Sequence, residues 1–72
     1  MSDEMLDEPI YPDIEVELSG QDGNAFAIVS RTARAMGRGG VSMEQVDLFR
    51  EEATSGDYEH LLAVVQKWVT VS

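Results

Sequence analysis

The chain has 72 residues, no cysteine and a formal net charge of −9. A domain of this size hides only about 60% of the surface that its unfolded chain exposes, so we expect one marginally stable domain that gains from association with a second copy or a partner. The absence of cysteine excludes disulfide bonds, thiolate metal sites and a cysteine nucleophile.

No apolar run approaches the ~20 residues of a membrane-spanning helix. The first eight residues are acidic where a secretion signal would be basic. We therefore expect a cytoplasmic protein without a membrane partner.

The acidic side chains are concentrated in the first third of the chain. Residues 1–22 contain eight acids and no lysine or arginine, whereas residues 23–72 contain six acids and all five basic residues. Phosphate backbones are bound by clustered cations, so this distribution argues against nucleic acid as a partner. It leaves open a protein partner with a basic surface.

Residues 1–11 carry four acids and Pro9. Such a segment buries too little apolar area to offset the entropy lost on ordering, and we interpret it as a mobile acidic tail. The remaining residues, 12–72, would form a single α+β domain. A functional alternative for the tail is a short linear motif whose apolar anchors enter a partner's groove. These anchors would be Met5, Leu6, Ile10 and Tyr11.

Two strands are predicted near the ends of the domain. Residues 13–18 alternate strictly between acidic and apolar side chains, which predicts a half-buried strand that starts after Pro12. Its inward side chains would be Ile14, Val16 and Leu18. The sequence W-V-T-V over residues 68–71 is rich in strand formers. We predict that it pairs with the first strand, because a lone buried strand would leave its backbone groups unpaired.

Three helices are predicted between these strands. The first runs from about Asn24 to Arg38, with Asp22 or Asn24 as its N-cap, and the glycines at positions 37, 39 and 40 end it. Ser42, followed by glutamine three residues later, predicts a capped second helix to about Thr54. The third would run from a cap at Asp57 or Ser55 to about Gln66. The side chains expected to face the core include Phe26, Val29, Ala33, Met36, Val46, Phe49, Ala53, Leu61, Leu62, Val65 and Trp68, whereas Glu51 and Glu52 are expected to face water.

The predicted fold is therefore α+β, with the order β-α-α-α-β and a small two-stranded sheet on three short helices. A two-stranded sheet is marginally stable by itself. Two copies that join sheet edges would form four strands, so we predict a homodimer.

Catalytic and metal-binding patterns are weak. His60 has no partner histidine or cysteine for a metal, and a surface position explains it better than nucleophilic catalysis. The turn before Asn24 lacks the glycine and lysine spacing of a phosphate loop. Counted from Asp22, a calcium loop would need a glutamate where Ala33 stands. We predict no cofactor, no metal and no enzymatic activity; a hydrolase that uses Glu15 and Glu17 is the enzymatic alternative.

The candidate binding residues form two sets, three arginines on the first helix and the two glutamates of the first strand, Glu15 and Glu17. Spacings of three and four place Arg31, Arg34 and Arg38 on one side of the first helix. They could contact an anion, a nucleic acid or an acidic protein, or they could be neutralised by Glu15, Glu17 or the acidic tail. We favour neutralisation because no aromatic side chains are interleaved with the arginines and the chain is acidic.

The chain resembles two groups of proteins. Residues 35–66 are similar to the three-helix scaffold of ubiquitin-associated domains, through Met36-Gly37, Leu48-Phe49-Arg50 and Gly56-Asp57-Tyr58-Glu59. Residues 12–72 resemble small acidic proteins of unknown activity from actinobacteria and their phages, through P-D-I-E-V-E-L-S-G-Q-D-G-N-A-F and the ending W-V-T-V-S. The second resemblance implies a phage or actinobacterial origin and carries over no binding residue.

These observations favour a small non-enzymatic protein-protein interaction module, which would act as a modulator of a host protein if a phage encodes it. The alternative is a nucleic-acid-related protein in one of two opposite senses. Its arginines would contact phosphate, or the acids of residues 1–22 would imitate phosphate and occupy a nucleic-acid-binding protein.

Overall fold

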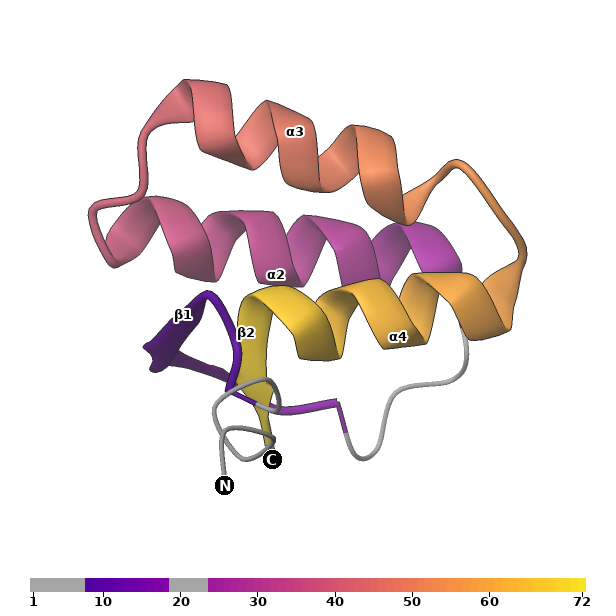
Figure 1. Ribbon diagram of the computed structural model, residues 1–72, viewed down its shortest axis with the longest axis horizontal. Helices are drawn as coiled ribbons and strands as arrows, with labels where there is room; N and C mark the ends of the chain where they lie inside the picture. The colour runs from indigo at the N-terminus through magenta and orange to yellow at the C-terminus, as the bar shows by residue number, and fades with distance from the viewer. Residues whose placement is uncertain (1–7, 19–23) are drawn as a thin grey trace.

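Figure 1 shows the computed structural model of the chain, which describes residues 8–18 and 24–72. A strand, three helices and a second strand follow one another along the chain. Their bounds are Tyr11–Val16 for β1, Ala25–Arg38 for α2, Met43–Ala53 for α3, Tyr58–Trp68 for α4 and Val69–Val71 for β2. The predicted α+β fold and its β-α-α-α-β order are confirmed, with the small sheet packed against the helices.

The two strands pair in parallel, an orientation that the sequence left open. The paired positions are Tyr11 with Val69, Glu15 with Thr70, and Val16 with Val71, and the register shifts between Tyr11 and Glu15. Pro12 lies in this irregular stretch, where its missing N–H breaks no regular ladder. Its carbonyl accepts a hydrogen bond of 2.8 Å from the Thr70 hydroxyl.

Backbone hydrogen bonds continue the contact between the two ends of the domain beyond the strands. The Ile10 N–H donates to the Lys67 carbonyl at 2.9 Å, and the Ser72 N–H donates to the Val16 carbonyl at 3.0 Å. Parallel strands require a long crossover connection, and here the three helices together form it.

β1 begins at Tyr11, two residues before the predicted start. The Tyr11 ring stacks on the Trp68 indole, with centroids 6.1 Å apart and planes at 25°. Trp68 is itself the last residue of α4 and not the first of the second strand. The stacking gives Tyr11 apolar contact area that a solvated tail would lack.

All three helices begin at a side chain that accepts hydrogen bonds from the first turn. Oδ1 of Asn24 accepts from the Phe26 N–H at 2.9 Å, Oγ of Ser42 from the Gln45 N–H at 3.3 Å, and Oδ1 of Asp57 from the His60 N–H at 2.9 Å. These contacts satisfy N–H groups that a helix cannot pair internally, and they confirm Asn24, Ser42 and Asp57 as N-caps.

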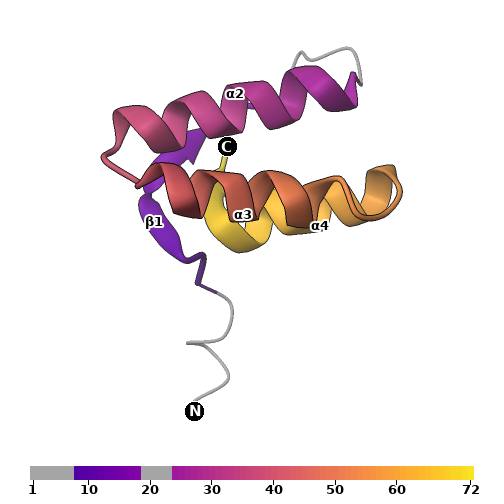
Figure 2. The same cartoon turned by 90° about the horizontal axis from the view of Figure 1, so that it is seen from above.

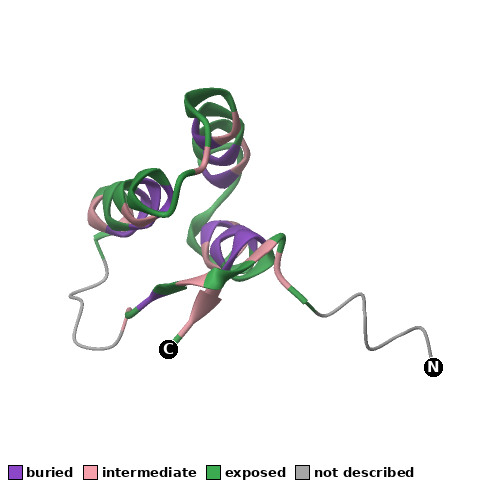
Figure 3. Cartoon of the chain, turned by 90° about the vertical axis from the view of Figure 1, so that its left-hand side faces the viewer, coloured by how far each residue is buried: buried purple, intermediate pink, exposed green. Residues whose placement is uncertain are grey.

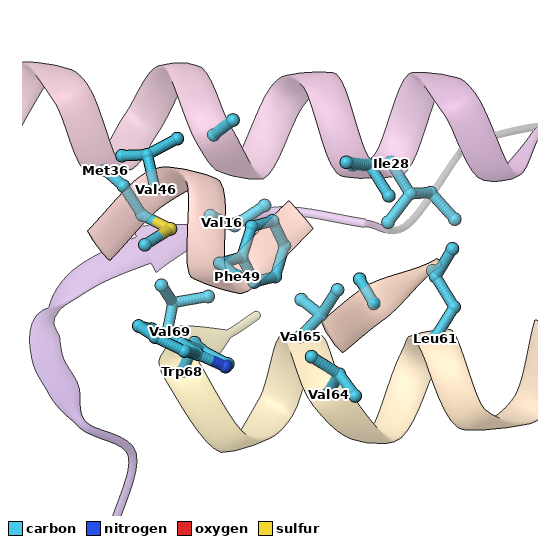
Figure 4. Close-up of a cluster of buried hydrophobic side chains, with 13 residues drawn as sticks. Val16, Ile28, Met36, Val46, Phe49, Leu61, Val64, Val65, Trp68 and Val69 are labelled. Atoms are coloured by element: carbon cyan, nitrogen blue, oxygen red, sulfur yellow. The ribbon is translucent and has the colours of Figure 1, made fainter. Parts of the chain in front are cut away.

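The buried residues lie on the faces of the helices that turn toward one another and toward the sheet (Figure 3). Figure 4 shows Phe49 of α3 projecting toward Trp68 of α4, with ring centroids 5.9 Å apart in an edge-to-face arrangement. The other buried hydrophobic residues are Val16, Ile28, Val29, Ala33, Met36, Val46, Ala53, Leu61, Val64, Val65 and Val69. Most of the predicted core is present in this set, and α2 contacts both other helices and β1.

Two side chains are placed differently from the sequence prediction. Phe26 was expected in the core, yet 80% of its side chain is exposed. Glu52 was expected to face water, yet it is half-buried and hydrogen-bonded to Lys67 and Trp68. Both predictions were wrong because three-and-four spacing within one helix does not show which other elements lie beside a given side chain. α3 does not cover Phe26, whereas the last turn of α4 lies beside Glu52.

Several predictions fall outside the described residues. These are the tail anchors Met5 and Leu6, all three acids of residues 1–7, and the turn of residues 19–23 with its possible cap Asp22. Among the helices that are described, none combines the length and the apolar character needed to cross a membrane.

Candidate functional site

The five candidate residues named from the sequence surround one hollow between β1 and α2. Its volume is about 380 Å³, and its charged lining consists of Glu15, Glu17, Arg31, Arg34 and Arg38. Glu15 lies in β1 and Glu17 directly follows it, on either side of Val16, while one-turn spacing in α2 aligns the three arginines. Segments that are distant in the sequence therefore bring opposite charges to the same place.

The mixed charge of this hollow determines what it can attract. Three guanidinium groups and two carboxylates share it, so the carboxylates offset much of the attraction that the arginines alone would exert on phosphate. Arg31 and Arg34 are exposed, and long-range attraction there is also screened by salt. The arrangement is consistent with the neutralisation that we favoured from the sequence.

A larger hollow, about 570 Å³, lies between α2 and α3, which run side by side in Figures 1 and 3. We call it the α2–α3 groove. Its apolar lining consists of Phe26, Val29 and Leu48. Leu48 is 48% exposed, so two large apolar side chains of this lining face solvent together.

The position of Phe26 follows from the geometry of α2. The buried residues Ile28, Val29 and Met36 define the core-facing direction of the helix. At 3.6 residues per turn, Phe26 points about a quarter of a turn away from that direction, toward Ser30 and the α3 side. Because α3 has already ended in the region opposite the first turn of α2, no described element covers the ring.

A second apolar hollow adjoins the other side of Phe26. It has a volume of about 250 Å³ and is lined by residues from the start of α2, the end of α3 and the start of α4, among them Ala53 and Tyr58. Tyr58 is 42% exposed. Phe26 is thus the centre of an exposed apolar surface that extends over all three helices.

The rim of the α2–α3 groove on the α3 side is acidic. Glu44, Asp47 and Glu51 line it at spacings of three and four, so they form one stripe along the helix, with Arg50 beside them. Within the described part of the chain, none of these three carboxylates has a recorded hydrogen bond or ion pair, and all three are exposed. Sequence reasoning missed this stripe, although the same spacing rule that aligned the arginines would have identified it.

A third cluster joins the end of α3 to α4. Nε2 of His60 lies 2.8 Å from the Glu52 carbonyl oxygen and 3.2 Å from Oγ of Ser55. The Ser55 hydroxyl donates to the same carbonyl at 2.8 Å. Helical spacing did not indicate a hydroxyl beside His60, because the contact spans five residues across the turn between the helices.

This cluster lacks the arrangement of a catalytic dyad. A carbonyl oxygen only accepts, so Nε2 of His60 carries the proton in its 2.8 Å contact with Glu52. The Ser55 proton points to that carbonyl and not to the imidazole. His60 therefore cannot take a proton from Ser55 in this geometry. Both side chains instead satisfy an end carbonyl of α3.

The Glu52 carboxylate connects α3 to the last turn of α4. Oε2 accepts from Nζ of Lys67 at 2.6 Å, and Oε1 accepts from Nε1 of Trp68 at 3.0 Å. The hydrogen bonds from Lys67 and Trp68 lower the pKa of Glu52 below its ordinary value because they stabilise the charged form. The arrangement holds the Trp68 indole in position beneath Phe49.

Metal binding finds little support in the described residues. No group of three or more histidine, aspartate or glutamate side chains there is arranged to hold a metal ion. Asp22, the first residue of the calcium loop weighed above, lies outside them.

Comparison of the chain with protein-family models, with curated proteins and with solved structures finds no match. The site must therefore be interpreted from its own geometry.

Proposed function

We propose that this chain is a small non-enzymatic protein-interaction module, and that it binds its partner through Phe26 and the α2–α3 groove. The observation that carries the proposal is the 80% exposure of Phe26 between two apolar hollows. Full burial of such a side chain contributes about 2 kcal/mol, so leaving it in water forgoes that stabilisation. Large exposed aromatic side chains that border apolar hollows are typical anchors of protein interfaces.

The site chemistry supports this class over an enzyme. The only histidine donates to a helix-end carbonyl, and the nearby hydroxyl donates to the same atom. Glu15 and Glu17 share their hollow with three arginines, whose positive charge offsets that of the carboxylates. We place the protein in the cytoplasm, and in the host cytoplasm if a phage encodes it, where it would modulate a host protein.

The homodimer predicted from the sequence remains a prediction. The sheet is packed on the helical layer, which supplies support that the sequence argument assigned to a second copy. Sedimentation equilibrium would test it directly: a mass of twice 7.9 kDa supports the dimer, and a mass of 7.9 kDa contradicts it.

The proposal is tested by affinity capture from a lysate of the source cell with three baits. These are the wild-type chain, Phe26→Ala and Met43→Ala. Met43 is a matched control because its side chain is 76% exposed on α3 but does not line the groove. We expect one protein to be retained in near-stoichiometric amount by the wild-type and Met43→Ala baits and at least about tenfold less by Phe26→Ala.

A partner that is retained equally by Phe26→Ala would contradict the proposed surface. Far-UV circular dichroism of the three baits should be identical, because both substituted side chains are exposed. This control separates a loss of contact from a loss of folding.

A further inference from the structure

We infer that the segment which occupies the α2–α3 groove is a basic amphipathic helix of the partner protein. The inference rests on the proposed function and specifies the chemistry of the partner. It follows from three features of the groove: its apolar lining, its acidic rim, and the pairing of the backbone N–H and C=O groups of its walls within their own helices.

The apolar lining requires an apolar face on the occupant. Phe26 and Leu48 are exposed, and Val29 closes the floor between them. The groove runs between two helices that are in contact. An occupant that covers these side chains must therefore present apolar groups along the whole groove. Anchors at positions i, i+3, i+4 and i+7 of a helix provide such a face.

The walls of the groove favour a helix over an extended peptide. Both walls belong to helices, whose interior N–H and C=O groups are already paired within α2 and α3. An extended peptide laid between them would find no backbone partners for its own polar groups as they lose water. A helix pairs these groups internally and fits between two helices by ridge-and-groove packing.

The rim determines the charge of the occupant. The α3 side of the groove carries three carboxylates, from Glu44, Asp47 and Glu51, and only one guanidinium, from Arg50. The carboxylates extend over about 10 Å of α3, the length of two helical turns. Lysine or arginine at matching spacing on the occupant would pair with a stripe that has no recorded partner within the described residues. The net charge of −9 would accelerate the approach of such a segment.

A second copy of this chain fits the groove less well. Its own basic stripe, Arg31, Arg34 and Arg38, shares a hollow with Glu15 and Glu17 and carries no large apolar side chain. Two copies, each with a charge of −9, would also repel one another. We therefore assign the groove to a different protein.

The test uses two model peptides of about 18 residues, long enough for five helical turns. Both carry leucine at i, i+3, i+4 and i+7; one carries lysine and the other glutamate at every polar position. Binding of each fluorescein-labelled peptide to the full chain is measured by anisotropy at about 0.02 M and about 0.3 M NaCl. Amide shifts of the ¹⁵N-labelled chain locate the bound peptide.

We expect the lysine peptide to bind at least about tenfold more tightly than the glutamate peptide, and to lose much of this preference at the higher salt concentration. The amide shifts should centre on Val29, Leu48 and Glu51. Equal binding of both peptides, no binding of the lysine peptide, or shifts confined to residues 8–18 would overturn the inference.

Two triple variants separate a local effect from the overall charge. The groove variant combines Glu44→Gln, Asp47→Asn and Glu51→Gln. The control variant combines Glu8→Gln, Asp13→Asn and Glu59→Gln, which removes the same number of exposed charges outside the groove. We expect the groove variant to bind the lysine peptide about tenfold more weakly and the control variant to change binding less than about twofold. Equal losses in both variants would overturn the inference.

Failure of this inference and failure of the proposed function are distinguishable. A captured partner that depends on Phe26 but binds through an acidic or extended segment would overturn the basic helix and leave the interaction module intact. A captured partner that is indifferent to Phe26 would overturn the proposed surface itself.

Discussion

At the scale of single residues, Phe26 and Phe49 show how position within a helix decides the role of the same side chain. Phe49 is fully buried against Trp68, whereas Phe26 is 80% exposed. Both belong to amphipathic helices and both follow apolar spacing. Only the neighbours supplied by the tertiary structure distinguish them.

This contrast makes a prediction about stability. Phe49→Ala should lower the free energy of unfolding by about 3–5 kcal/mol, because it removes a buried ring and leaves a cavity. Phe26→Ala should change it by less than about 0.5 kcal/mol, as expected for an exposed site. Urea denaturation followed by circular dichroism measures both. A large destabilisation by Phe26→Ala would show that the ring is part of the core.

Glu52 links stability to pH. Because its folded-state pKa lies below the ordinary value, the carboxylate stabilises the fold above the ordinary pKa of the group, and this contribution is lost as pH falls through the lowered folded-state pKa. Glu52→Gln should lower the free energy of unfolding by about 1 kcal/mol at pH 7, since the contact to Lys67 is partly exposed to solvent. The difference from wild type should shrink as the solution becomes acidic.

Glu51→Gln is the control for this prediction. Glu51 precedes Glu52 on α3 and is exposed, and its carboxylate accepts no hydrogen bond and forms no ion pair within the described residues. Denaturation of both variants at pH 7 and at pH values below the ordinary carboxyl range would compare them. A Glu52→Gln effect that does not vary with pH would contradict the assigned role of the charge.

At the scale of secondary-structure elements, only one of the described glycines, Gly40 at the end of α2, adopts a positive φ. Gly40 has φ of +92°, a conformation that other residues rarely adopt, and it turns the chain from α2 toward α3. Gly37 lies within α2, and a methyl group added there would meet no atom within 4 Å.

The two glycines should therefore respond in opposite directions. Gly40→Ala should destabilise the fold by about 1 kcal/mol, because alanine is strained at positive φ. Gly37→Ala should stabilise it by about 0.5–1 kcal/mol, because alanine favours the helix. Thermal unfolding of the two variants tests the pair, and a gain of stability from Gly40→Ala would refute the assigned turn.

The sequence predicted the helices and strands better than the contacts between them. Local patterns identified the cap at Ser42 and narrowed the other two to Asp22 or Asn24 and to Asp57 or Ser55, because a cap depends on residues within one turn. The first strand was placed two residues late, since its start depends on the stacking of Tyr11 on Trp68, a contact between opposite ends of the chain. The parallel orientation of the strands is likewise a property of the whole fold.

The candidate sites follow the same rule. Spacing within α2 aligned Arg31, Arg34 and Arg38, and the fold places them beside Glu15 of β1 and Glu17, which follows the strand. The exposure of Phe26 could not be predicted, because it depends on where α3 and α4 lie relative to the first turn of α2. The acidic stripe on α3 follows from spacing in the sequence, but no local pattern showed that it borders the same apolar groove as Phe26.

At the scale of the whole molecule, the two sides of α2 present different chemistry. On the β1 side, arginines and glutamates share a polar hollow. On the α3 side, an apolar groove is bordered by unpaired acids within the described residues. A short chain thereby combines a compact core with one surface suited to a basic apolar partner.

Site-specific photocrosslinking can show whether Phe26 contacts a protein partner. A benzophenone amino acid would replace Phe26 in one version of the full chain and Met43 in another, and each would be irradiated in the source cell. The account predicts a covalent adduct with one protein from position 26 and at most a trace from position 43. Adducts of equal yield from both positions, or none from position 26, would contradict it.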